Sequence, residues 1–162
     1  MMKVSLDALD PEEGTDASIS VTEWLWRPVC SIMAIANHRQ FEKTGSLPFR
    51  YDFFEDIDCN CGYYTEYISS CKRISEEMIF LARSPEVLEE YGMTVELEDG
   101  EFIYTYPISM CTSAIEDRET EKIVVTPGDH KKDNLRSVFR IKEKDLVSIS
   151  KFIGSCGGFN MP

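Results

Sequence analysis

The sequence predicts a single α+β domain over residues 1–162, with a mixed or antiparallel sheet and three main helices. An Asp99-Gly100 pair between two alternating apolar segments predicts an antiparallel hairpin over residues 93–106. Apolar residues recur at helical spacing in three stretches, residues 28–39, 70–83 and 143–155. These helices and strands do not alternate as regular βαβ units, and 162 residues with 43% apolar content suffice for one core.

The first quarter of the chain predicts a strand followed by a helix. Residues 1–16 are acidic and contain Pro11 and Gly14, so we expect a mobile lead-in or a loop after a short first strand. Residues 18–25 have a β-like pattern. Because proline suits the first position of a helix, the strand is predicted to stop near Trp26 and the helix to run from Pro28 to about residue 39.

The remaining elements follow from capping and turn residues. Residues 41–61 have no clear period and predict a loop with a short strand at 51–54. A serine cap precedes the helix at 70–83, and Ser84-Pro85 starts a short helix over 85–91. Residues 109–121 predict a polar connection, 122–126 and 137–141 predict strands, and Gly157-Gly158 ends the last helix.

Charge is divided unevenly along the chain. Residues 1–121 contain 25 Asp and Glu against 9 Lys and Arg, whereas residues 122–162 contain 4 against 8, and the net charge is -12. A field of this sign repels nucleic acid and attracts basic surfaces. We therefore expect a protein partner with a basic surface and no direct contact with nucleic acid.

The compartment follows from the same reading of composition. The first residues lack the apolar core of a signal peptide, and the longest uncharged apolar stretch, residues 29–36, is too short to span a bilayer. These features predict a cytoplasmic protein without membrane contact, in which the six cysteines are free thiols.

Two kinds of site chemistry remain as alternatives. Cys59, Cys61 and Cys71 cluster in sequence, but a structural zinc site uses paired C-x₂₋₄-C hooks and this chain has one C-x-C, so we expect no cofactor. His38 or His130 with a cysteine and a carboxylate is the alternative for an enzyme with a scattered active site. Neither histidine lies in a catalytic motif.

Two segments resemble a family of small bacterial and phage-encoded proteins of uncharacterised function. Trp24-Leu25-Trp26-Arg27-Pro28 is similar to a tryptophan-rich strand that ends in W-R-P before a helix, and Ser155-Cys156-Gly157-Gly158-Phe159 is similar to the end of their last helix. Asn60-Cys61-Gly62 is a looser match to a turn before a helix. The resemblance implies no activity and transfers no catalytic residue.

Together these observations predict a non-enzymatic interaction protein that binds a basic protein surface, as immunity proteins and phage inhibitors of host defence do. A DNA mimic that inhibits a nucleic-acid-binding protein is the variant of this hypothesis. The sequence does not indicate the oligomeric state. The predicted contact residues are all acidic: Glu86, Glu89, Glu90, Glu96, Glu98, Asp99 and Glu101.

Overall fold

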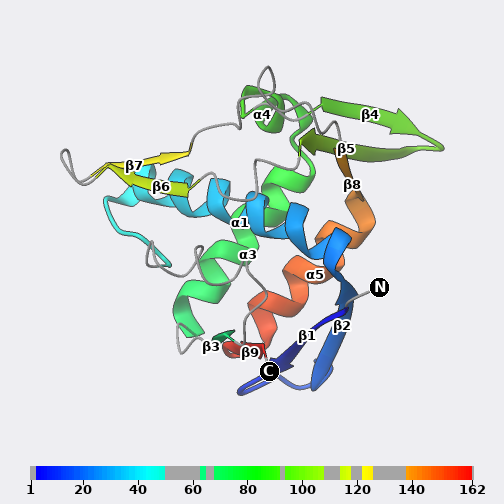
Figure 1. The fold of residues 1–162 in the computed structure, drawn as a ribbon. Helices are drawn as coiled ribbons and strands as arrows, with labels where there is room; N and C mark the ends of the chain where they lie inside the picture. The colour runs from blue at the N-terminus through cyan, green and yellow to red at the C-terminus, as the bar shows by residue number, and fades with distance from the viewer. Residues whose placement is uncertain are drawn as a thin grey trace.

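The computed structural model describes residues 3–49, 63–64, 68–91, 94–107, 114–117, 122–125 and 138–161. These residues form an α+β fold, as predicted (Figure 1). The helices are α1 (Glu23–Thr44), α3 (Ile68–Ala82), α4 (Pro85–Glu90) and α5 (Glu143–Ser155).

The described strands form three antiparallel sheets. The first has the order β2-β1-β9-β3 and consists of β2 (Ser18–Thr22), β1 (Lys3–Ala8), β9 (Phe159–Met161) and β3 (Tyr63–Tyr64). The second has the order β4-β5-β8 and consists of β4 (Thr94–Glu98), β5 (Glu101–Pro107) and β8 (Val138–Lys142). The third pairs β6 (Ala114–Asp117) with β7 (Lys122–Val125).

The core lies among the three long helices, which occupy the middle of the molecule between the first two sheets (Figure 1). Helix α3 packs against both α5 and α1. Trp26 of α1 is 1% exposed and meets Phe159 of β9 edge to face, with ring centroids 6.4 Å apart. The end of the chain therefore closes the core over the start of α1.

The predicted boundaries of α1 are wrong at both ends. The helix begins at Glu23 because the Thr22 hydroxyl caps it, accepting a hydrogen bond from the Leu25 N–H at 3.2 Å. Pro28 lies inside the helix, so the β-like segment ends at Thr22 and not near Trp26. Starting at Glu23 puts Trp26 and Val29 on one buried face, and this burial favours the longer helix.

At its other end α1 continues to Thr44. Gly45 adopts a left-handed φ of 72° and its N–H bonds to the Phe41 carbonyl at 2.8 Å, which ends the helix. The loop predicted over residues 41–61 is therefore wrong at 41–44. The short strand predicted at 51–54 lies outside the described residues.

Several predictions are confirmed. The hairpin turns at Asp99 and Gly100, whose φ values of 52° and 79° fit a two-residue turn of the primed type. The last helix has the predicted bounds, and the two middle helices differ from theirs by one or two residues. A first strand, β1, precedes the acidic loop. Strand β6 was not predicted, because it falls in the connection expected over 109–121.

Candidate protein-binding surface

All seven predicted contact residues lie on helix α4 or on the β4–β5 hairpin, and the structure describes the side chains of six. Helix α4 contacts β4, and the β4–β5 hairpin projects from the body of the molecule beside it (Figure 1). The described carboxylates of both elements are exposed to solvent. We call this the α4–hairpin surface, and it comprises Glu86, Glu89, Glu90, Glu96, Leu97, Glu98 and Asp99. Glu101 begins β5 directly after the turn, and its side chain lies outside the described part.

Leu97 is the feature of this surface that the sequence analysis did not single out. It is 68% exposed, more than Leu9 and Phe80, the other exposed large apolar side chains in the described part of the chain. It stands between Glu96 and Glu98 in the chain. Since exposing a leucine to water costs free energy, a partner that covers Leu97 would stabilise the complex.

A hollow of about 340 Å³ adjoins the turn of the hairpin. It is lined by the carboxylates of Glu98, Asp99 and Asp145 of α5 and by apolar residues that include Ile103 and Ile141. Lys142 supplies a cation at this edge. The acidic surface thus ends at a recess where a partner's side chain has both apolar and charged groups to contact.

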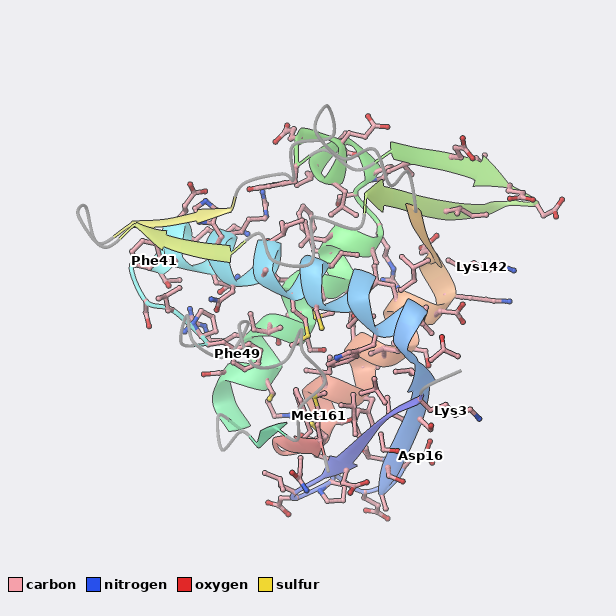
Figure 2. The ribbon with its side chains drawn as sticks, in the orientation of Figure 1. Lys3, Asp16, Phe41, Phe49, Lys142 and Met161 are labelled. Carbon is pink, nitrogen blue, oxygen red and sulfur yellow. The ribbon has the colours of Figure 1, made fainter. Side chains whose placement is uncertain are left out.

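The remaining carboxylates are not all gathered there. A second set, Asp10, Glu12, Glu13 and Asp16, is exposed on the loop between β1 and β2. Figure 2 shows Asp16 at the end of the molecule away from the hairpin. Glu12 in this set pairs with Lys72 of α3. Among the described residues, Glu42 of α1 and Glu76 of α3 are exposed as well. The α4–hairpin surface is distinguished from the second set by its leucine, because Leu97 is 68% exposed whereas Leu9, beside Asp10, is 38% exposed.

The cysteine candidates do not come together as a metal site within the described residues. Cys59 and Cys61 lie outside them, and no group of three His, Cys, Asp or Glu side chains among the described residues is placed to hold a metal. Cys71 is 1% exposed in α3 and donates a hydrogen bond to the buried Cys156. This hydrogen bond and burial raise the pKa of Cys71, so it stays a neutral thiol.

The histidine candidates give no catalytic arrangement in the described part of the chain. His38 of α1 lies with Nε2 3.1 Å from Glu42 Oε1 on the next turn, and His130 lies outside the described residues. No described histidine or cysteine lines the hollows of about 420, 340 and 440 Å³. Cys30, Cys71 and Cys156 are buried, which removes them from contact with a substrate.

A buried carboxylate that the sequence analysis missed joins α1 to α3. Glu77 accepts hydrogen bonds from Arg39 Nε at 2.6 Å, Lys43 Nζ at 2.9 Å and Gln40 Nε2 at 3.0 Å. Burial alone would raise the pKa of Glu77, but these donors outweigh it and lower the pKa. Glu77 lies beside Met78 on the buried side of α3. In the sequence, this interaction is indicated only by a carboxylate at a position of the helix that faces the core.

No protein-family model, no curated protein and no solved structure matches the chain. Among the described residues, none of the helices has the length and apolar character needed to cross a bilayer.

Proposed function

We propose that this protein is a non-enzymatic interaction protein that binds a basic surface of another protein through the α4–hairpin surface. The observation that carries the proposal is the 68% exposed Leu97 set among exposed carboxylates on a projecting hairpin. Protein-binding surfaces combine an apolar anchor with a polar rim in this way.

The two kinds of side chain have separate roles in this proposal. Burying a leucine fully contributes about 1.5–3 kcal/mol, so Leu97 supplies affinity. The carboxylates of α4 and β4 attract a cationic partner, raise the association rate and make it sensitive to salt. A phosphate backbone has no apolar group equivalent to Leu97, and for this reason we favour a basic protein surface other than a nucleic-acid channel over DNA mimicry.

The biological role that fits this chemistry is inhibition by occupation. An immunity protein or a phage inhibitor of host defence covers a basic functional surface of its target, and this chain would do so in the cytoplasm of a bacterial or host cell. Such a role requires no catalytic group or cofactor.

A capture experiment with two charge-matched variants tests the proposal. The surface variant carries Glu89→Gln, Glu90→Gln and Asp99→Asn, and the control variant carries Asp10→Asn, Glu13→Gln and Asp16→Asn in the β1–β2 loop. Both lose three negative charges from exposed positions. We expect the wild type and the control to retain one basic protein from host lysate at low salt and to release it at high salt, and the surface variant to lose it.

Equal retention by both variants would contradict the proposal, because the α4–hairpin surface would then not be the contact. Retention by wild type that does not change with salt would likewise contradict an electrostatic contact.

A further inference from the structure

We infer that the basic partner docks by adding a strand to the edge of β4 that faces away from β5, and that the docked segment is extended with Lys or Arg alternating with apolar residues. This inference depends on the proposed function and specifies how the partner is bound. It follows from the register of the hairpin and from the side chains on the two faces of β4.

The backbone of β4 has hydrogen-bonding groups directed to its outer edge. A two-residue turn closes on a hydrogen-bonded pair, here Glu98 and Glu101, and the ladder then repeats at every second residue. Glu96 therefore bonds towards β5, whereas Leu97 and Val95 direct their N–H and C=O groups away from it. Among the described strands, β4 pairs with β5 alone.

The side chains of β4 divide by chemistry between the two faces of the sheet. Glu96 and Glu98 lie on one face, where Glu96 is in register with Ile103 and Lys142, and Glu98 is in register with Glu101. Val95 and Leu97 lie on the other face. Since neighbouring strands place their alternate side chains side by side, an added strand would set every second residue against carboxylates and the others against apolar groups.

A second copy of this chain is a poor occupant of the edge. Pairing two β4 strands would bring the rows of Glu96 and Glu98 next to each other, and like charges on paired strands are destabilising. Natural sheets protect their edges with charged residues, but here the charges cover one face and leave Leu97 exposed on the other. A cationic, alternating strand is complementary to the charge of one face and to the apolar side chains of the other, and it can hydrogen-bond to the outward-directed backbone groups.

Amide exchange of the full-length protein tests the inference with defined probes. The probe is the peptide Lys-Val-Lys-Val-Lys-Val, and the control peptide has the same composition in two blocks, Lys-Lys-Lys-Val-Val-Val. With the alternating peptide we expect exchange of the Leu97 and Val95 amides to slow about tenfold or more, while that of Glu96, already bonded to β5, changes little. Equal slowing by the block peptide, or no slowing at Leu97, would overturn the inference.

A pair of variants at one position separates the backbone contribution from the side chain. Leu97→Pro removes the outward N–H, and proline is tolerated on an edge strand where that group faces solvent. Leu97→Ala removes the same apolar contact and keeps the N–H. We expect the alternating peptide to bind Leu97→Pro about tenfold more weakly than Leu97→Ala, with both variants folded by circular dichroism.

The outcomes distinguish this inference from the proposed function. Equal peptide affinity of Leu97→Pro and Leu97→Ala would overturn strand addition, while loss of the captured protein in the charge variant of α4 and the turn would still support the proposed function. If that charge variant keeps its captured protein, the proposed function fails and strand addition fails with it.

Discussion

At the scale of single residues, the buried carboxylate of Glu77 joins α3 to α1 through three side chains. It is 5% exposed, so its charge is tolerated only because Arg39, Lys43 and Gln40 surround it. Phe80 lies beside the same group, with Arg39 Cζ 5.6 Å and Lys43 Nζ 5.7 Å from its ring centroid. The cations are thus held between a carboxylate and an aromatic face, which fixes α1 against α3.

Glu77→Gln should destabilise the protein by about 2 kcal/mol near pH 7, because it leaves two cations without their carboxylate. The pKa of Glu77 is lowered in the folded protein, so its contribution is complete above the ordinary carboxyl pKa of 4.5 and is lost as the pH falls through the lowered pKa. The stabilities of wild type and variant, measured by urea unfolding, should therefore converge as the pH falls through the lowered pKa. Glu76→Gln, at an exposed position on the same helix, is the control and should change stability by less than about 0.5 kcal/mol at any pH. A pH-independent difference for Glu77→Gln would contradict this account.

At the scale of elements, the end of α5 fixes the β1–β2 loop to the core. Leu9, Asp10 and Glu12 donate backbone hydrogen bonds to carbonyls of Gly158, Cys156 and Ser155, at 2.9, 3.0 and 2.9 Å. Gly157 makes this approach possible: its φ is 68°, and a Cβ there would overlap the Asp10 carbonyl. The acidic loop is therefore tied to the C-terminal segment, and β9 continues directly into the sheet with β1.

Gly157→Ala should be strongly destabilising, and Gly14→Ala provides its matched control. Both glycines have left-handed φ values, 68° and 84°, so both substitutions carry the same backbone strain of about 1 kcal/mol. Only at Gly157 does the added Cβ also meet backbone, whereas Gly14 faces open space. Thermal unfolding should show Gly157→Ala at least about 2 kcal/mol less stable than Gly14→Ala. Equal losses of stability in the two variants would contradict this prediction, because the β1–β2 loop would then move away from the added Cβ at no cost in free energy.

The elements that sequence predicts well here are those determined locally. The Asp99-Gly100 turn and the last helix depend on residues next to them, and both have the predicted bounds. The predicted start of α1 is wrong because it was based on Pro28, which suits the first position of a helix. The actual start is determined by the cap at Thr22 and by the burial of Trp26, which depends on the distant Phe159. Strand β9 could not be predicted from its three residues, since its partners β1 and β3 lie far along the chain.

At the scale of the whole molecule, sequence predicted the composition of the candidate surface better than its geometry. The clustering of acidic residues at positions 86–101 indicated which side chains to consider, and six of them are exposed on adjoining elements. Hairpin register and the exposure of Leu97 depend on tertiary structure: Leu97 follows the apolar alternation of Val95, yet the hairpin extends beyond the core that covers Val95. The second acidic set was predicted to lie in a mobile lead-in or in a loop after a short first strand, and its position away from the hairpin (Figure 2) follows only from the fold.

Crowding of like charges on the α4–hairpin surface has a consequence for stability that can be measured without any partner. Local crowding of carboxylates predicts that removing three of these charges stabilises the protein. The triple variant Glu89→Gln, Glu90→Gln and Asp99→Asn should be more stable than wild type by about 0.5 kcal/mol at low salt. The matched triple variant in the β1–β2 loop, Asp10→Asn, Glu13→Gln and Asp16→Asn, should be stabilised less. Asp99 tolerates this change because asparagine also favours its left-handed φ of 52°.

Denaturant unfolding at about 0.02 M and about 1 M salt separates the local effect from the effect of net charge, because the screening length falls from more than ~20 Å to about 3 Å. The advantage of the surface triple should disappear at high salt. Equal stabilisation by both triples would show that repulsion comes from the net charge of -12 as a whole, and the carboxylates of α4 and β4 would then have no special electrostatic role. A dedicated binding site of this kind lowers the stability of the free protein. The protein regains that stability when a cation-rich partner binds and neutralises the carboxylates.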